Sequence, residues 1–152
     1  MEARSSLEIR ALRYLAQREY SRRELQRKLS TPSDSPVSEE LTGILDKLEQ
    51  QGFLSEERAA AQIARTRRNR FGSQRIVQEL KNKGIDSHLI DGIVPALKET
   101  ELETALHIWR KKFTQPPASR EERAKQMRFM MNRGFSTQTI QQVFAQTAED
   151  NR

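Results

Sequence analysis

The residues best suited to binding chemistry are arginines and lysines crowded into the middle of the chain. Five arginines fall within residues 65–75 and two lysines follow by residue 83, with Glu79 as the single acid among them. Five arginines are more than are needed to offset a helix dipole, although for Arg65 or Arg70 taken singly that explanation is as good as a binding role. Guanidinium groups match planar oxyanions, so we expect a patch that binds phosphate or carboxylate. The members of this predicted patch are Arg65, Arg67, Arg68, Arg70, Arg75, Lys81 and Lys83.

A second group of basic residues lies further along the chain, but acids dilute it. Glu121 and Glu122 interrupt the group, so a solvated helix face is the better interpretation of each position. As possible secondary contacts we keep Arg110, Lys111, Lys112, Arg123, Lys125 and Arg128.

Four aromatic residues near these groups offer flat surfaces on which nucleic-acid bases can stack. They are Phe71, Trp109, Phe113 and Phe129. Trp109 and Phe113 continue an apolar helical stripe, which favours core packing for both. The pattern leaves Phe71, beside Gly72, undecided.

Residues suited to catalysis or metal binding are scarce. The chain has two histidines and no cysteine, which excludes disulfides and cysteine-based zinc sites. It contains no glycine-rich phosphate loop, paired metal-ligand motif or nucleophile elbow. The paired acids at residues 39–40, 56–57 and 121–122 are typical of helix first turns, where they offset the dipole. We therefore expect no enzymatic activity, no metal and no cofactor.

Short helices must position the basic residues, because apolar residues recur at helical spacing along most of the chain. Leu41, Ile44 and Leu48 belong to one such stripe, and no segment of useful length alternates with the period of a strand. Residues 21–24 and 119–122 each fit a capping box, which predicts helices that begin there. With 35% apolar and 32% charged residues, the chain has too little apolar material for one large core.

An internal repeat organises these helices. A helix predicted to end at Lys83–Gly84, or at Arg133–Gly134, runs directly into an apolar residue and the start of another helix. The first copy of this corner is a looser loop at residues 30–36. Glu24–Leu25 and Glu79–Leu80 recur 55 residues apart, and Gly84 and Gly134 recur 50 apart. A period of this size indicates a tandem helical array.

The expected fold is all-α: an elongated, curved tandem array of three three-helix, helix-turn-helix-like repeats. The repeats are expected at residues 1–54, 55–97 and 98–152, with Pro95 marking a break before the third. Each repeat is small, so its neighbours must pack against it for stability.

The net charge indicates the kind of partner, and the absence of long apolar segments indicates the cellular location. A net charge of +6 indicates a polyanion or an acidic protein surface as partner. No apolar run approaches the roughly 20 residues that cross a bilayer, and the N-terminus lacks the apolar segment of a signal peptide. We therefore expect a cytoplasmic protein that makes no use of a membrane.

Two sequence blocks are distinctive in residue type and spacing. The first reads Tyr20-Ser21-x-x-Glu24-Leu25-x-x-Lys28-Leu29. The second reads Gly72-x-x-Arg75-Ile76-x-x-Glu79-Leu80-x-x-Lys83-Gly84-Ile85. Together they resemble the RecX family of recombinase regulators, and the likeness extends over about residues 7–145. The chain departs from the family at Ala59, where an aromatic residue is usual, and in its long loop at 30–37.

The resemblance implies three tandem three-helix units and a regulatory role without enzymatic activity. It implies binding to the filament of RecA recombinase on DNA, in the filament groove, and inhibition of strand exchange, ATP hydrolysis and co-protease activity. Recombination and the SOS response would be modulated in this way. Weak, non-specific affinity for single- or double-stranded DNA is also implied, and a monomer is the expected state.

An autonomous basic helical DNA-binding protein is the alternative. The predicted helix at residues 73–83 follows a basic helix and has the position of a groove-reading helix in a helix-turn-helix protein. Its base-edge readers are few, namely Gln74, Arg75 and Gln78. The sequence therefore favours the filament-binding regulator.

Overall fold

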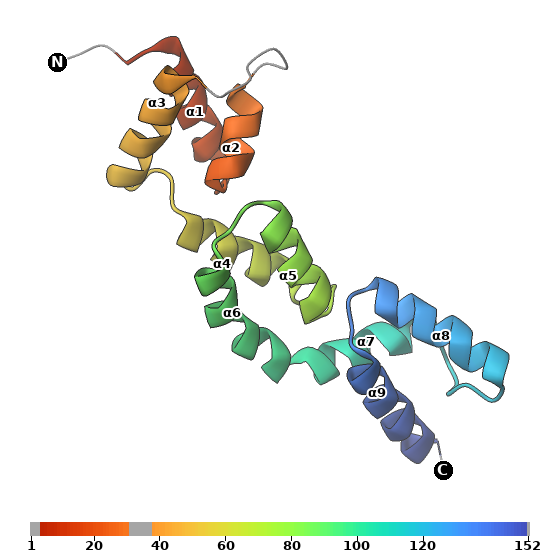
Figure 1. Cartoon of the computed structure of the whole chain (residues 1–152). Coiled ribbons are helices and arrows are strands. Elements are labelled where there is room, and N and C mark those ends of the chain that lie inside the picture. Colours follow the sequence, from red (N-terminus) through yellow and green to blue (C-terminus); the bar gives the residue numbers. More distant parts are fainter. Residues whose placement is uncertain (1–3, 31–37, 152) are drawn as a thin grey trace.

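The computed structural model describes residues 4–30 and 38–151, and in these ranges the chain forms α-helices and no β-strand. The helices (Figure 1) are α1 (Ser6–Gln17), α2 (Arg22–Leu29), α3 (Glu39–Gln50), α4 (Glu56–Arg67), α5 (Ser73–Asn82), α6 (Ser87–Glu99), α7 (Glu101–Lys112), α8 (Arg120–Asn132) and α9 (Thr137–Asp150). The predicted all-α class is confirmed over the described residues. None of these helices is long and apolar enough to cross a membrane.

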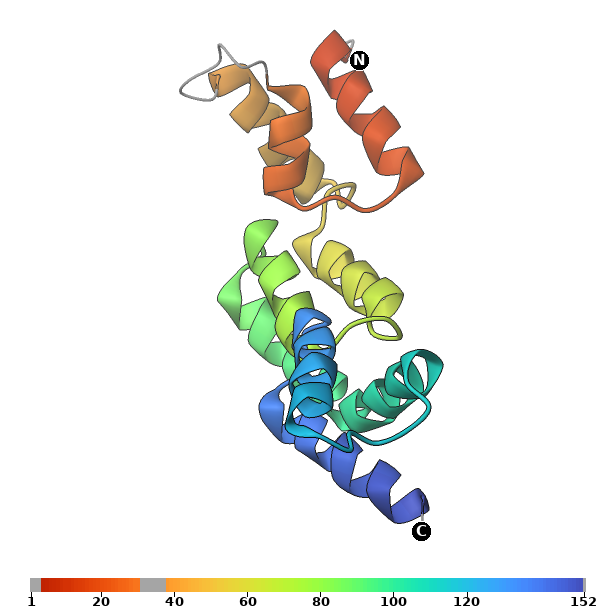
Figure 2. The ribbon, with the colours of Figure 1, turned by 90° about the vertical axis from the view of Figure 1, so that its right-hand side faces the viewer.

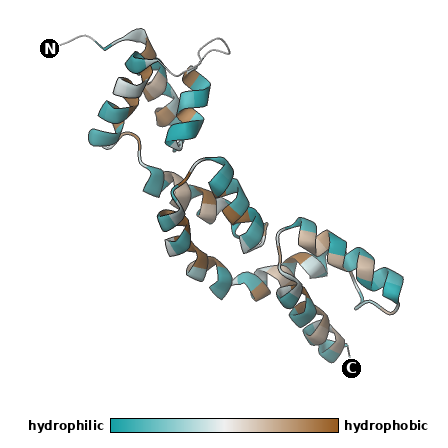
Figure 3. Cartoon of the chain, in the orientation of Figure 1, coloured by the Kyte–Doolittle hydropathy of each residue, from teal (hydrophilic) through white to brown (hydrophobic). Residues whose placement is uncertain are grey.

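Each group of three helices has a small hydrophobic core of its own. In unit 1 (α1–α3) the core surrounds Leu25 and Leu48, and in unit 2 (α4–α6) it surrounds Ile76 and Leu80. In unit 3 (α7–α9) it surrounds Phe135. Polar residues cover most of the remaining helix surface (Figure 3). Three separate cores are what a chain with 35% apolar residues can fill.

The units follow one another along an elongated, curved body, and the two ends of the chain lie at opposite ends of it (Figures 1 and 2). This arrangement confirms the expected tandem array. Residues 31–36 of the predicted first corner lie outside the described residues.

The predicted break at Pro95 is wrong, because α6 continues through it to Glu99, past the expected unit limit at residue 97. Proline lacks the N–H that would bond the carbonyl of Asp91 four residues earlier. Pro95 and Asp91 are both exposed, so water can bond this carbonyl and the helix persists.

The predicted glycine corners are present in units 2 and 3. Gly84 and Gly134 have φ angles of +77° and +95°, which only glycine adopts without strain. The next residue turns back onto its own helix: the N–H of Ile85 bonds the carbonyl of Leu80 at 3.1 Å. Ile85 and Phe135 are buried, so each corner directs an apolar anchor into its unit's core.

The repeat has a different register from the predicted one. The second helices of the three units have Ser21, Gly72 and Ser119 as N-caps, 51 and 47 residues apart. Leu25 in unit 1 therefore corresponds to Ile76 in unit 2, and not to Leu80. Both residues are buried four positions after their N-caps.

Each unit joins the next by the N-terminus of its second helix, which meets the glycine corner of the following unit. At the first junction the Ser21 hydroxyl donates to the Lys83 carbonyl at 2.6 Å. At the second junction the Gly72 N–H donates to the Arg133 carbonyl at 2.7 Å. Lys83 and Arg133 both immediately precede the corner glycines, so the two contacts correspond.

A glutamate at the start of the following unit completes each junction. Glu101, the first residue of α7, is buried and accepts from the Ser73 N–H at 3.2 Å and the Ser73 hydroxyl at 3.0 Å. Glu56, the first residue of α4, accepts correspondingly from the Arg22 N–H. Burial raises the pKa of Glu56, and hydrogen bonds from the backbone at Arg22 and Asp86 oppose that rise only in part. Helix N-termini favour such anions.

Substituting Gly72 by Ala should disrupt the second junction. A Cβ there would overlap the Gly134 carbonyl and lie 2.7 Å from the Phe135 nitrogen, and these backbone atoms have little room to move. We expect the free energy of unfolding to fall by about 1–3 kcal/mol. Gly92→Ala is the control, because nothing lies within 4 Å of its new Cβ in α6. Denaturant unfolding followed by circular dichroism measures both, and equal stability of the two variants would contradict the junction.

Candidate nucleic-acid interface

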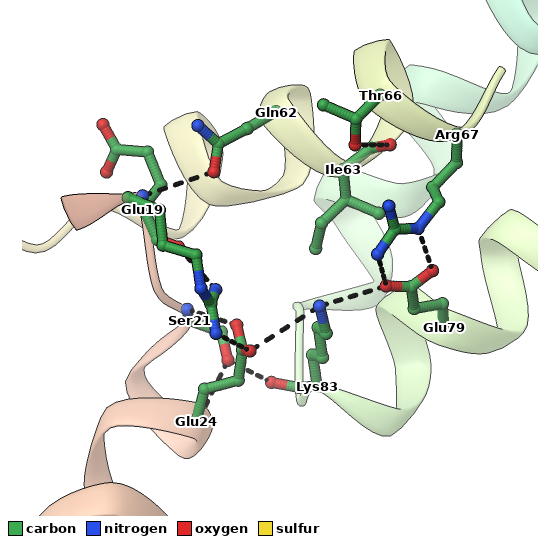
Figure 4. Close-up of polar contacts among 10 residues, drawn as sticks. Glu19, Ser21, Glu24, Gln62, Ile63, Thr66, Arg67, Glu79 and Lys83 are labelled. Atoms are coloured by element: carbon green, nitrogen blue, oxygen red, sulfur yellow. Dashed lines mark hydrogen bonds and ion pairs between the residues drawn. The ribbon is translucent and has the colours of Figure 1, made fainter. Parts of the chain in front are cut away.

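Arg67 and Lys83 of the predicted patch belong to a network of ion pairs at the first junction, in which Lys83 reaches across to Glu24 of unit 1 (Figure 4). Arg67 Nε lies 3.0 Å from Glu79 Oε1, and Lys83 Nζ lies 3.0 Å from Glu79 Oε2. Lys83 also lies 3.6 Å from Glu24 of unit 1, which Arg18 contacts at 3.1 Å. The side chains of Arg67 and Lys83 are only 34% and 23% exposed. Both are therefore less available to a ligand than the exposed members of the patch.

The two carboxylates of this network are held in their charged form. Burial by itself would raise the pKa of Glu24, but the Ser21 N–H together with Arg18 and Lys83 lowers it below its usual value. Burial would also raise the pKa of Glu79, but Arg67 and Lys83 outweigh this effect, so the pKa of Glu79 is lowered. The Ser21–Glu24 capping box is formed in both directions, which confirms that prediction.

Arg68 and Arg70 lie instead on a groove at the boundary of units 2 and 3. They belong to the turn between α4 and α5, which faces α7. The Arg68 guanidinium donates to the Thr100 hydroxyl at 3.1 Å, which fixes its side chain against the start of α7. Arg70 is exposed. Two adjoining hollows of about 710 and 310 Å³, which share Arg70 and Lys111, make up what we call the basic groove.

Positive charge dominates the basic groove. Its charged lining residues are Arg68, Arg70, Lys111, Lys112 and Arg133, with Glu103 as the one acid among them. The structure thus brings two members of the predicted patch together with two predicted secondary contacts from α7. A concave surface with this charge attracts a polyanion and retains it through several contacts.

Three arginine side chains lie near the ring of Phe71 at the edge of the groove. The guanidinium carbons of Arg75, Arg70 and Arg133 lie 4.1, 5.4 and 5.8 Å from its ring centroid. Arg75 also donates to the Asn132 carbonyl at 3.0 Å and so bridges units 2 and 3. This environment explains the aromatic residue that the sequence left undecided, because cations are attracted to its ring face.

The other predicted basic residues lie apart from the groove. Arg110 pairs with Asp150 at 3.3 Å, and Arg123 lies 4.9 Å from the Phe144 ring centroid. Lys125 lines a further hollow beside the loop after α7, which adjoins the groove at Lys112. The remaining predicted residues are exposed on their helices, and they are Arg65, Lys81 and Arg128.

Arg133 is a groove residue that the sequence interpretation did not select. It immediately precedes Gly134, as Lys83 precedes Gly84, so the repeat itself marked this position. Trp109 is buried, and its indole N–H donates to Gln126 at 2.8 Å, which confirms its predicted core role. Phe113 packs against the same core.

Acid should weaken the ion pairs at the first junction. Because the pKa of Glu79 is lowered in the folded state, the unfolded state binds more protons as the pH falls below about 4.3. The stabilisation is present above that pH and is lost as the pH falls through the folded-state pKa. Urea unfolding of the protein and of Glu79→Gln at pH 7 to 3 should show a stability difference that shrinks toward acid. Glu56 contributes with the opposite sign in both proteins, so parallel curves would contradict the role of Glu79.

Known proteins are similar to this chain in sequence and in fold. The sequence patterns of the second and third three-helix domains of RecX match residues 55–92 and 99–144. Regulatory protein RecX of Leptothrix cholodnii is 48% identical over 91% of this chain and 87% of its own length. That of Herbaspirillum seropedicae is 45% identical over 94% and 91%. The crystal structure of RecX from Lactobacillus salivarius has the same fold, with a TM-score of 0.74 at 21% identity, covering 93% of this chain and 94% of that one. This chain belongs to the RecX family of regulatory proteins.

Proposed function

We propose that this chain binds the filament of RecA recombinase on DNA and inhibits strand exchange, ATP hydrolysis and co-protease activity. It would thereby modulate recombination and the SOS response. Membership of a family of regulatory proteins supports the regulatory part of this proposal. The basic groove supports the nucleic-acid part, because five cations from units 2 and 3 converge there against one acid.

An elongated array suits a filament as its target. Its three units present several surfaces along one body, so that weak contacts to successive protomers and to DNA add through a high effective concentration. The chain acts as a monomer in the cytoplasm and as a binding regulator, without catalysis. Its contacts to DNA are weak and non-specific because they are mainly electrostatic.

The geometry of α5 argues against an autonomous helix-turn-helix reader. Such proteins contact base edges with the N-terminal residues of the recognition helix. Here the N-terminus of α5 is occupied: Gly72 and Ser73 are buried, and both bond residues of unit 3. Of the three candidate base-edge readers, Arg75 is bonded to the Asn132 carbonyl of unit 3, while Gln74 and Gln78 are exposed, so duplex DNA would compete with unit 3 for the start of α5.

Removing charge from the groove should abolish most of the inhibition. The test variant replaces Arg70, Lys111 and Lys112 by Ala, and all three side chains are exposed. The control replaces three exposed arginines of unit 1, which changes the net charge equally, and they are Arg10, Arg13 and Arg27. Strand exchange and ATP hydrolysis by RecA on single-stranded DNA are measured with each. Equal inhibition by the two variants would contradict a role for the groove.

Binding measured across salt concentrations separates the filament regulator from a simple DNA binder. Five groove cations that each meet one phosphate predict a slope of log affinity against log salt of about −3.5 for single-stranded DNA. The RecA filament should bind more tightly than free DNA at every salt concentration, because contacts between proteins add affinity without releasing counterions from DNA. Fluorescence titrations at several salt concentrations measure the slope and both affinities. Equal affinity for free DNA and for the filament at every salt concentration would mean that DNA is the sole ligand.

A further inference from the structure

The two hollows of the basic groove differ in chemistry. The larger one is lined by polar side chains, among them Thr100, Thr104 and Glu103, beside its cations. The smaller one has apolar residues as well, namely Ile108 and Phe129. Cations surround these apolar residues, because Lys112 and Arg133 also line the smaller hollow. Phosphate binding explains the cations but gives no reason for an aromatic ring among them.

The two hollows are continuous. They share Asn69, Arg70, His107 and Lys111, so a ligand chain can lie in both at once. Their volumes of about 710 and 310 Å³ fall within the usual range of small-ligand sites, about 300–1,000 Å³. The smaller hollow therefore has room for one flat ring, and the larger for the backbone that continues from it.

The Phe129 ring is held in a fixed orientation. It packs edge-on against Phe113, with centroids 5.4 Å apart and an interplanar angle of 88°. The Arg133 guanidinium carbon and the Lys112 Nζ lie over the ring, 5.2 and 5.6 Å from its centroid. A nucleic-acid base stacks on such a ring through its π-face and here takes the place of one of these cations, which can then turn to a flanking phosphate.

We propose that the smaller hollow binds one unstacked base of single-stranded DNA against Phe129, with Arg70, Lys111 and Arg133 holding the adjacent phosphates. The inference deepens the proposed function and rests on its assignment of the groove to nucleic acid. Duplex DNA fits this site poorly, because extracting a paired base costs stacking and pairing free energy. An acidic peptide would satisfy the cations but leave the apolar surface of Ile108 and Phe129 uncovered.

The test compares ligands that share phosphates and differ in their bases. The full chain is titrated with a labelled thymidine oligomer, with an abasic oligomer of equal length, and with the corresponding duplex. The thymidine oligomer should bind about tenfold more tightly than the abasic one, the effect expected of one stacked base. Polyglutamate, added as a competitor, should displace the oligomer poorly, because it has no bases.

Two variants localise the effect. Phe129→Leu should bind both single-stranded oligomers with the affinity that the original chain has for the abasic one. Phe53→Leu is the matched control, because Phe53 is 45% exposed between α3 and α4, in unit 1, and does not line the groove; it should keep the tenfold preference. Arg70→Ala should weaken binding of both oligomers by a similar factor. Circular dichroism verifies that each variant is folded.

Several outcomes would overturn the base site. They are equal affinity for the thymidine and abasic oligomers, a preference retained by Phe129→Leu, duplex bound as tightly as single strand, or efficient competition by polyglutamate. Loss of filament inhibition is a separate result. If the chain prefers the thymidine oligomer but leaves RecA activities unchanged, the base site stands and the proposed function fails.

Discussion

The architecture depends on one contact: the N-terminus of a unit's second helix docks on the glycine corner and first glutamate of the next unit. Free N–H groups at a helix start require acceptors, and here the Arg133 carbonyl and the Glu101 carboxylate supply them from outside the unit. Because the three cores remain separate, these polar contacts set the relative positions of the units. The second junction lies next to the turn after α4, where Arg68 bonds Thr100 and the basic groove is found.

The two junctions differ in how closely the backbones approach and in which side chains surround the contact. At the second, Gly72 and Gly134 approach so closely that no side chain fits, so the groove residues on either side are held in place. At the first, a chain of ion pairs through Glu24, Lys83 and Glu79 surrounds the corner. Salt screens exposed ion pairs, whereas close backbone packing is insensitive to it. The ion pairs at the first junction are partly buried, so salt weakens them only in part, and the packing of Gly72 on Gly134 is the contact that salt affects less.

Local signals in the sequence predicted the fold, because each acts within a few residues. Gly84 and Gly134 end their helices where a positive φ is needed, and Ser21 caps α2. The site was less predictable, because its residues meet only in the tertiary structure. Spacing gave Arg67 and Arg70 equal standing, yet Arg67 reaches Glu79 while Arg70 faces the groove. Lys111 lines the groove beside Arg70 but is 41 positions away in sequence. Helical periodicity relates residues within one helix and cannot predict that these two meet.

Hydrogen exchange of the chain on the RecA filament tests the central claim most directly, namely that the groove between units 2 and 3 meets the nucleic acid. Amide exchange is compared for the free chain, the chain with single-stranded DNA, and the chain with RecA filaments. Both complexes should slow exchange at residues 68–72 and 107–112, and the filament alone should add protection elsewhere. Protection by DNA confined to unit 1 or to α9, with unchanged exchange at the groove, would contradict the account.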